Sequence, residues 1–296
     1  SMTLESDIDK LIGCQRPGRT LEQVFYRDPE IYQLELRRVL SPQWLYVAHE
    51  SELPESGDFL TYDIAEDSII VVRGLDRELR AFFNVCRHRG SQICLEKSGN
   101  TRRFVCPYHA WGYDLDGKLV SARHMPSDFQ YGDYGMHCCQ IEVMEGLIFI
   151  SLASKGSAEF SQIRDNLLPY LKPHDLARTK VVHQEIYPID ANWKLVVENF
   201  RECYHCLPSH PQYTQVNEYV RAAERDSEIY EVMVRKFAEA SERKDRKSGM
   251  GSFPFPVQPH YVWRIPIRDG YKTLTRDGSP AGPLLGEFKE YDGAET

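Results

Sequence analysis

Cys86-Arg87-His88 and Cys106-Pro107-Tyr108-His109 are the two motifs from which the organisation of this chain follows. Two thiolates and two imidazoles in this order and spacing can hold a [2Fe–2S] cluster, with both cysteines on one iron and both histidines on the other. Because neutral imidazoles replace two thiolates, the reduction potential lies above that of an all-cysteine cluster. Such a cluster accepts and donates single electrons at a moderate potential.

A structural zinc site is the main alternative for these four residues. Such sites usually pair cysteine with cysteine and histidine with histidine, whereas each motif here contributes one of each, which favours the cluster. Gly90 and Pro107 suit tight loops around a cluster. Trp111 and Tyr113 follow the second motif, and we expect them to cover the cluster with apolar surface.

Length and charge limit the possible functions. At 296 residues the chain is long for one compact unit, so two domains are expected. The net charge of −8 argues against nucleic-acid binding. No apolar run approaches the roughly 18 residues that span a bilayer, and no signal peptide is visible. We therefore expect a cytoplasmic protein without a nucleic-acid or membrane partner.

The remaining cysteines are expected to be free thiols in a reducing compartment, because a chain of this size with no secretory signal does not need a disulfide framework. Cys203 and Cys206 form a Cys-x-x-Cys pair, which we interpret as two small packing side chains. A redox dithiol or a zinc knuckle is the alternative for this pair. The cysteines outside the cluster motifs are Cys14, Cys94, Cys138, Cys139, Cys203 and Cys206.

The first half of the chain changes from a helical to a strand pattern. Asp28 and Pro29 are expected to open a helix that continues to about Val39. Short β-rich runs follow from about residue 57, and Asp114 to Lys118 predicts a hairpin turn after the second motif. The expected strands are 59–62, 68–72, 79–85 and 146–150. These runs predict a small all-β domain over residues 42–155, after an N-terminal helical segment over 1–41.

The pattern becomes mostly helical after a polar linker at residues 153–159. Helices are expected over 160–171, from Asp190 onward and over 218–247, and a strand over 181–187. Residues 156–296 are therefore expected to form a second domain.

A second metal site is predicted in this domain. Asn199, Glu202 and His205 follow at three-residue steps and share one face of the expected helix, and His210 lies in the turn after it. Two imidazoles beside a carboxylate are the ligands of a 2-His-1-carboxylate iron(II) site, which leaves open positions for O2 and substrate. The alternative is that both histidines are ordinary core or surface residues.

Taken together, the two motifs resemble those of the large (alpha) subunit of the Rieske non-haem iron oxygenases, of the ring-hydroxylating type. The resemblance runs from about Trp44 through His210 and includes the run Cys106 to Trp111. It implies an α+β chain, in which a small all-β Rieske [2Fe–2S] domain precedes a catalytic domain of curved antiparallel sheet plus helices. It also implies a homotrimer, in which the cluster of one subunit faces the mononuclear iron of its neighbour.

The resemblance also implies roles for the residues of the second site. His205 and His210 would bind mononuclear Fe(II), and Glu202 would bridge cluster and iron across the subunit interface. A flavin- or ferredoxin-type reductase would supply NAD(P)H electrons, and O2 would hydroxylate a C–H bond of a small molecule. The family's third iron ligand is a later acid, so we expect it beyond Thr296, in a segment that this sequence does not include.

Most members that act on aromatic rings carry Asp where this chain has Glu202, and Glu is the form associated with quaternary-ammonium substrates such as betaine, carnitine or stachydrine. N-demethylation is therefore the expected reaction. Aromatic-ring dioxygenation or O-demethylation is the first alternative, and an electron-carrying Rieske protein without oxygenase activity is the second. An aromatic cage would suit a cationic substrate. The candidate cage residues are Tyr204, Phe253, Phe255, Tyr261 and Trp263.

Overall fold

The computed structural model describes residues 4–153, 159–201, 205–216, 270–271, 275, 277, 279–280 and 282–283. The chain divides into two compact units. The first comprises Ser1–Asn166 with Leu176–Ile186, and the second comprises Leu167–Asp175 with Tyr187–Thr296. All strands among the described residues belong to the first unit.

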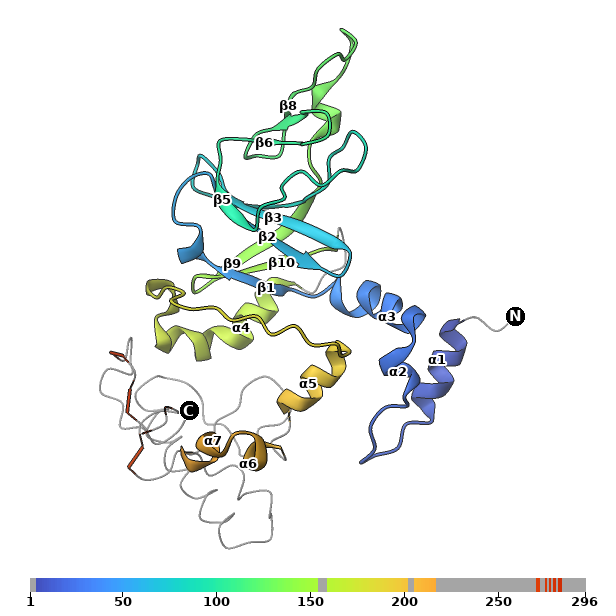
Figure 1. The fold of residues 1–296 in the computed structure, drawn as a ribbon, viewed down its shortest axis with the longest axis vertical. Helices are drawn as coiled ribbons and strands as arrows, with labels where there is room; N and C mark the ends of the chain where they lie inside the picture. The colour runs from blue at the N-terminus through green and yellow to red at the C-terminus, as the bar shows by residue number, and fades with distance from the viewer. Residues whose placement is uncertain are drawn as a thin grey trace, which may run out of the picture. The chain divides into compact units, whose positions relative to one another are not determined.

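Seven strands form the main sheet of the first unit, in the order β1-β10-β9-β4-β3-β2-β5, with every neighbouring pair antiparallel (Figure 1). The strand β3 (Asp67–Arg73) is central, and its residues 69–72 are fully buried. Ile70 and Val72 belong to one hydrophobic core, whereas Ile69 and Val71 belong to another. Both faces of β3 are thus covered, which explains an apolar run without alternation. The other strands are β1 (Leu45–His49), β2 (Asp58–Ile64), β4 (Leu79–Phe83), β5 (Ser98–Asn100), β9 (Cys138–Met144) and β10 (Leu147–Ser151).

A second, three-stranded sheet carries the second cysteine–histidine motif. Its strands β6 (Phe104–Val105), β7 (Gly112–Tyr113) and β8 (Leu119–Ser121) pair in sequence order. The predicted hairpin turn between β7 and β8 is confirmed, because Asp114 Oδ1 accepts from the backbone N–H groups of Asp116 at 3.0 Å and Lys118 at 2.8 Å. Gly117 supplies the left-handed backbone of this turn, with φ of +78°.

Helices precede and follow the sheets. The predicted cap at Asp28 is confirmed, since Asp28 Oδ1 accepts from the N–H groups of Glu30 at 2.8 Å and Ile31 at 3.2 Å. The helix α3 (Pro29–Glu35) then continues as a π-helical turn, Leu36–Leu40. The other helices are α1 (Leu4–Gly13), α2 (Val24–Arg27), α4 (Phe160–Leu171), α5 (Trp193–Arg201), α6 (Cys206–Ser209) and α7 (Pro211–Val216), and short 3-10 turns occupy Glu50–Glu52, Tyr131–Tyr134, Lys172–His174 and Leu176–Arg178.

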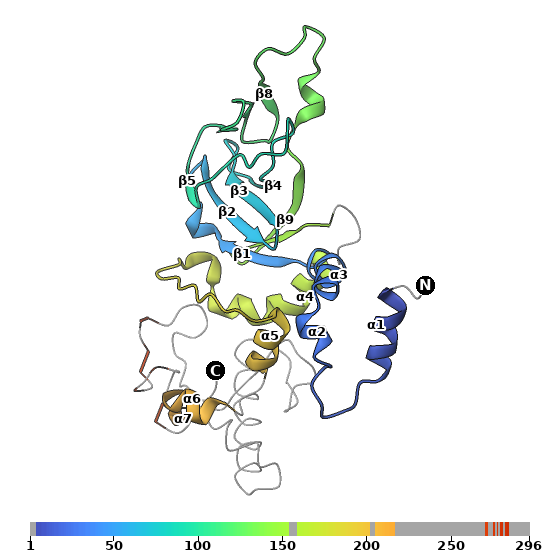
Figure 2. The same ribbon diagram turned by 45° about the vertical axis from the view of Figure 1, so that its right-hand side comes forward.

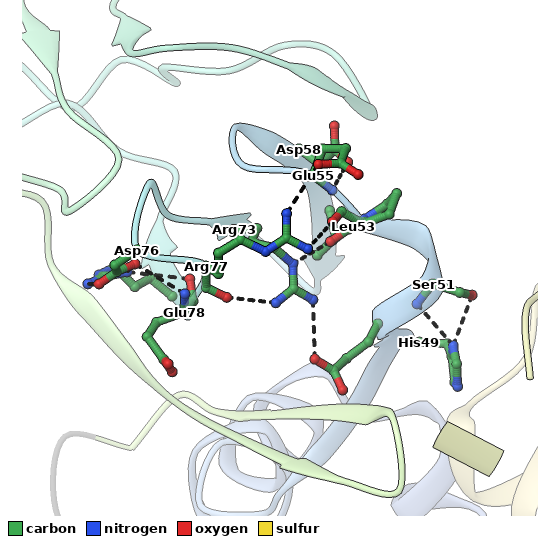
Figure 3. Close-up of polar contacts among 12 residues, drawn as sticks. His49, Ser51, Leu53, Glu55, Asp58, Arg73, Asp76, Arg77 and Glu78 are labelled. Carbon is green, nitrogen blue, oxygen red and sulfur yellow. Dashed lines mark hydrogen bonds and ion pairs between the residues drawn. The ribbon is translucent and has the colours of Figure 1, made fainter. Parts of the chain in front are cut away.

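Arg73 joins the segment after β1 to the turn between β3 and β4 (Figure 3). Its buried guanidinium donates to the carbonyl oxygens of Leu53 and Arg77, the latter at 2.8 Å, and pairs with the Glu50 carboxylate at 3.2 Å. Arg77 donates back to the carbonyl oxygen of Pro54 at 2.8 Å. Because these acceptors surround the buried cation, the β1–β2 connection is fixed against the end of β3 and the turn that follows it.

His49 attaches residues 176–186 to the same unit. Its Nδ1 accepts from the N–H of Ser51 at 3.1 Å, a contact drawn in Figure 3, and its Nε2 lies 3.0 Å from the carbonyl oxygen of Leu176. The Ser51 hydroxyl accepts from the N–H of Val181 at 3.2 Å. These contacts explain why the segment belongs to the first unit although it follows α4 in the chain.

The predicted strands at 59–62, 68–72, 79–85 and 146–150 are confirmed as parts of β2, β3, β4 and β10. The predicted strand over 181–187 is wrong: these residues form no strand, and Val182 and Ile186 are largely exposed. Strand formation needs a partner backbone, and none pairs with this segment among the described residues. The predicted helix over 218–247 and the expected sheet of the second domain lie outside the described residues.

Candidate metal centres

The first cysteine–histidine motif lies in a tight loop after β4. The N–H of Cys86 donates to the carbonyl oxygen of Ser91 at 2.8 Å, and the N–H of Gly90 donates to the carbonyl oxygen of Cys86 at 2.9 Å. Gly90 has φ of +72°, in the left-handed region that glycine adopts at little cost. The loop is closed at its base by a single bridge between Val85 and Gln92.

The second motif repeats the geometry of the first. The N–H of Cys106 donates to the carbonyl oxygen of Trp111 at 2.8 Å, and the N–H of Ala110 donates to the carbonyl oxygen of Cys106 at 3.0 Å. Ala110 takes the place of Gly90 and has φ of +59°. Two equivalent loops therefore present one cysteine and one histidine each, as the sequence pattern predicts.

The structure brings the four predicted ligands together. Cys86 and Cys106 are buried, with exposed fractions of 2% and 1%, whereas His88 is half-buried and His109 is exposed. The two imidazole rings lie 4.5 Å apart between centroids, at 75°. The Nδ1 atom of His88 is buried and has no hydrogen-bond partner among the described residues. A buried ring nitrogen without a partner is costly unless something else binds it.

Tyr113 acts on the cluster loops through its hydroxyl, and not only as the apolar cover expected from the sequence. Its oxygen accepts from the N–H of Arg87 at 3.1 Å and lies 3.3 Å from the Sγ of Cys86, within hydrogen-bond distance of the sulfur. Burial raises the pKa of the Cys86 thiol above its usual value, and the hydrogen bond with Tyr113 offsets a part of this rise. Burial likewise raises the pKa of Tyr113 above its usual range, which keeps the hydroxyl protonated.

These residues fit a [2Fe–2S] cluster. The donor set is two buried sulfurs and two imidazoles, and the orphaned Nδ1 of His88 is free to bind metal. Among the described residues, no three His, Cys, Asp or Glu side chains converge on a single ion. Each loop presents one cysteine and one histidine, which suits a two-iron cluster with two protein ligands per iron.

The Asn84 side chain is hydrogen-bonded to the backbone that follows the first loop. Sequence reasoning did not identify this residue. Its Oδ1 accepts from the N–H groups of Ile93 at 3.1 Å and Cys94 at 2.8 Å, and its Nδ2 donates to the carbonyl oxygen of Cys94 at 2.7 Å. The side chain is 1% exposed. An amide residue directly between a buried strand and a metal-binding loop is the signal that could have identified it.

The second predicted site is partly described. His205 lies in the turn before α6, and His210 follows the end of α6, so a single helical turn separates the two histidines. Their ring centroids are 5.1 Å apart, at 85°. Two imidazoles that bind one ion through nitrogens at about 2.1 Å can adopt this arrangement. His205 does not lie on α5 with Asn199, contrary to the prediction of one shared helix face.

The other residues predicted for this site are not brought to it by the described structure. Asn199 lies near the end of α5 and is exposed. Its helix was expected from Asp190 onward and begins at Trp193, after Asn192, whose Oδ1 accepts from the N–H of Lys194 at 3.1 Å. Glu202 lies outside the described residues, and so do the cage candidates Tyr204, Phe253, Phe255, Tyr261 and Trp263.

Cys206 corrects the expectation of free thiols, because its sulfur is in a disulfide. Cys206 is therefore not the free packing side chain that we expected in the Cys-x-x-Cys pair. Cys203, the other member of the pair, lies outside the described residues. The free cysteines among the described residues are Cys14, Cys86, Cys94, Cys106, Cys138 and Cys139. No helix in the described part of the chain is both long and apolar enough to cross a bilayer.

Two family models match this chain. Residues 43–140 match the Rieske [2Fe–2S] domain, and residues 176–268 match the catalytic domain of ring-hydroxylating alpha subunits. The first match covers both cysteine–histidine loops and the second covers His205 and His210. The two matched domains imply a Rieske cluster and a mononuclear iron.

Curated relatives extend the similarity over most of the chain. The glycine betaine monooxygenase oxygenase subunit of Pseudomonas aeruginosa (strain UCBPP-PA14) is 35% identical over 277 residues, which are 92% of this chain and 64% of the relative. The carnitine monooxygenase oxygenase subunit of Escherichia coli (strain K12) is 36% identical over 218 residues, 70% of this chain and 57% of the relative. This chain thus spans somewhat less than two thirds of the length of these relatives.

Solved structures agree with this similarity. A quaternary ammonium Rieske monooxygenase in complex with L-carnitine superimposes with a TM-score of 0.59 at 32% identity, over 66% of this chain and 57% of that chain. Naphthalene 1,2-dioxygenase from Rhodococcus sp. superimposes with a TM-score of 0.61 at 32% identity, over 72% of this chain and 51% of that chain. The fold prediction of a Rieske domain followed by a catalytic domain, in a mixed α and β chain, is confirmed.

Proposed function

We propose that this chain, which combines a Rieske [2Fe–2S] domain with the catalytic domain of a ring-hydroxylating alpha subunit, acts as the oxygenase component of a multicomponent oxygenase. The observation that carries the proposal is the His205–His210 pair, 5.1 Å apart in a chain that already carries the cluster loops. An electron carrier alone has no use for a second metal site. The cluster, when bound, supplies single electrons at moderate potential.

The residues of the two sites would divide the work. The cluster would be held by Cys86, His88, Cys106 and His109. The two cysteines lie inside the core, and the His109 ring lies at the surface, where an electron leaves or arrives. His205 and His210 would hold the mononuclear iron together with a carboxylate. Among the described residues no carboxylate joins this pair, and the third ligand stays a prediction.

Quaternary-ammonium N-demethylation is the reaction that we propose. The similarity to glycine betaine and carnitine monooxygenase subunits supports this substrate class, and so does Glu202 in the position where ring-hydroxylating members carry Asp. Hydroxylation of an N-methyl group consumes O2, two electrons and two protons, and releases water. The resulting carbinol separates into formaldehyde, a tertiary amine and a proton.

The test is turnover with a substrate panel. The purified protein, a flavin- or ferredoxin-type reductase and NADH would be supplied with glycine betaine, carnitine, stachydrine or biphenyl. Formaldehyde formed in proportion to NADH oxidised, with a methylated amine only, is the expected result. A cis-diol from biphenyl without formaldehyde from any amine would instead favour aromatic-ring dioxygenation.

That second candidate rests on its own observation. The alpha subunit of biphenyl 2,3-dioxygenase from Rhodococcus jostii (strain RHA1) is 34% identical over 210 residues, 68% of this chain and 45% of the relative. O-demethylation belongs to the same alternative. An electron carrier without oxygenase activity would contain about two irons per chain instead of about three and would consume no O2 with any substrate.

Glu202 is proposed to couple the two metal sites across a subunit interface of a homotrimer. Glu202→Gln is expected to retain both metals but to lose substrate-coupled NADH oxidation, because the amide carries no negative charge and replaces one of the two acceptor oxygens with an NH2 donor. Glu198→Gln, which alters another carboxylate of the same region, is the matched control and should retain coupled turnover. Wild-type turnover of Glu202→Gln would refute the bridging role.

The domain limits are part of the same proposal: an N-terminal helical segment over 1–41, a Rieske domain over 42–155 and a catalytic domain over 156–296. A cytoplasmic location is also proposed; the free cysteines outside the cluster loops support it, whereas the disulfide at Cys206 does not. Sedimentation of the purified protein tests the trimer, and a monomer at micromolar concentration would contradict it.

A further inference from the structure

Trp111 lies flat against the His88 ring, the half-buried member of the histidine pair. The two ring centroids are 4.8 Å apart and the ring planes differ by only 12°. Trp111 is 3% exposed, so its indole shields that face of the imidazole. The buried Nδ1 of the same imidazole has no hydrogen-bond partner among the described residues.

Two further aromatic rings contact the Trp111 ring. Phe129 and Tyr134 meet the Trp111 ring edge-on, with centroid distances of 5.7 Å and 5.6 Å. They also stack on one another, 4.7 Å apart at 19°. Because each ring is fixed by the others, the indole has little freedom to tilt or slide. We call Trp111, Phe129 and Tyr134 the aromatic clamp.

The segment that supplies Phe129 and Tyr134 is itself anchored on the cluster loops. The Tyr131 hydroxyl donates to the carbonyl oxygen of Ala122 at 3.1 Å, which closes the segment on itself. Arg87, between the ligands of the first motif, donates through Nη1 to the carbonyl oxygen of Gly135 at 2.8 Å. Figures 1 and 2 show this excursion after β8, projecting beyond the seven-stranded sheet on the side of the small sheet.

We propose that the aromatic clamp is a positioning device for His88, which fixes the plane of its ring and keeps solvent from the cluster on that side. An imidazole that binds metal through one nitrogen can still rotate about the metal–nitrogen bond. Nδ1 is the nitrogen that would bind the metal, and the indole stacked on the ring face at 4.8 Å restrains this rotation. The proposal rests on the Rieske domain alone, and not on the substrate proposed above.

The clamp has a predictable electrostatic consequence. Reduction adds one negative charge to the cluster, and water near the cluster stabilises that charge. Because Trp111 replaces water with an apolar ring, it disfavours the reduced form. Removal of the indole should therefore raise the reduction potential, and a freed His88 ring should change the g values of the reduced cluster.

Three variants of the cluster-loaded protein test this: Trp111→Leu, Trp111→Phe and, as a control, Trp44→Phe, which alters a tryptophan that packs on Phe160 instead. Trp111→Leu is expected to shift the ratio of reduced to oxidised cluster about tenfold towards the reduced form at a fixed potential, about 59 mV for one electron. Its g values should change. Trp111→Phe keeps a ring for stacking and should retain the wild-type g values.

The measurements are a redox titration and the electron paramagnetic resonance spectrum, neither of which needs substrate or turnover. Wild-type potential and g values in Trp111→Leu would overturn the proposal, and so would equal shifts in Trp111→Leu and Trp111→Phe, because the role would then be filling of space. If Trp111→Leu binds no cluster, the same two measurements on Phe129→Leu and Tyr134→Leu test the proposal instead. A shift in the same direction supports the clamp, and unchanged spectra in both overturn it.

Discussion

Asn84 shows how much of the cluster site depends on one side chain that binds no metal. Asn84→Ala would leave the N–H groups of Ile93 and Cys94 without their partner inside the core, whereas the carbonyl oxygen of Cys94 would keep the hydrogen bond from Gln92 Nε2 at 3.1 Å. A buried polar group without a partner costs about 1–3 kcal/mol, so we expect a loss of about 3 kcal/mol in the free energy of unfolding. Chemical denaturation of the cluster-loaded protein measures this.

Ser68→Ala is the matched control. The Ser68 hydroxyl accepts a 3.2 Å hydrogen bond from Asn84 Nδ2 and hydrogen-bonds the Asp63 carboxylate, but it contacts no N–H group of the loop, so its removal should cost about 1 kcal/mol. Equal losses for the two variants would mean that the hydrogen bonds to the loop backbone are not what stabilises it.

The free cysteines provide a second prediction for single residues. Burial raises the pKa of Cys94 to about 11 and that of Cys139 to about 12. Only the thiolate reacts with alkylating reagents, and at pH 8 roughly one Cys94 in a thousand is ionised. Peptide mapping after iodoacetamide treatment should find Cys14 and Cys138, which are exposed, modified first. Labelling of Cys94 as fast as Cys138 in the folded protein would contradict the burial.

At the scale of the element, the two cluster loops differ at one equivalent backbone position. Ala110 has φ of +59° where Gly90 has φ of +72°, and the left-handed region costs a residue with a Cβ about 1–2 kcal/mol. Ala110→Gly is therefore expected to stabilise the loaded protein by about 1 kcal/mol, less a part lost to unfolded-chain entropy.

Gly90→Ala is the reciprocal variant, and it measures the free-energy cost of the left-handed backbone by itself. A Cβ built on Gly90 meets nothing within 4 Å, so no steric clash adds to the conformational cost. Thermal unfolding should show opposite signs for the two substitutions, with the cluster spectrum unchanged in both. The same sign for both would mean that the loops are not equivalent.

Sequence predicted those elements whose signals are local. The apolar run 69–72, the Asp28 cap and the turn at Asp114 are each encoded by neighbouring residues, and each is confirmed. The strands β1 and β9 were missed, because their mixture of polar and apolar residues makes sense only beside the partner strand β10. The opposite error occurred at 181–187, where β-favouring residues lack a partner.

The candidate site divides in the same way. Candidate ligands follow from motif spacing, so the four residues proposed for the cluster and the two histidines proposed for the iron could be named in advance. The aromatic clamp could not, because Phe129 and Tyr134 reach Trp111 only through the fold. The hydrogen bond between Tyr113 and Cys86 likewise joins residues that are distant in the sequence.

At the scale of the whole molecule, the two candidate metal sites lie in different compact units, the cluster loops in the first and the histidine pair in the second. Each site is assembled from loops and turns of its own unit, so loss of one metal should leave the ligands of the other in place. His205→Ala is accordingly expected to lower total iron from about three to about two per chain, with the visible and paramagnetic spectra of the reduced cluster unchanged.

His183→Ala is the matched control for this experiment. His183 is an exposed histidine that pairs with Glu185 at 3.3 Å, and its removal should leave about three irons per chain. Unchanged iron in His205→Ala would show that the 5.1 Å pair is not a metal site. A bleached cluster in His205→Ala would show that the two sites are not independent. Loss of about one iron with an intact cluster is the only outcome that fits two separate centres, and His210→Ala must then give the same result, because both rings would bind the same ion.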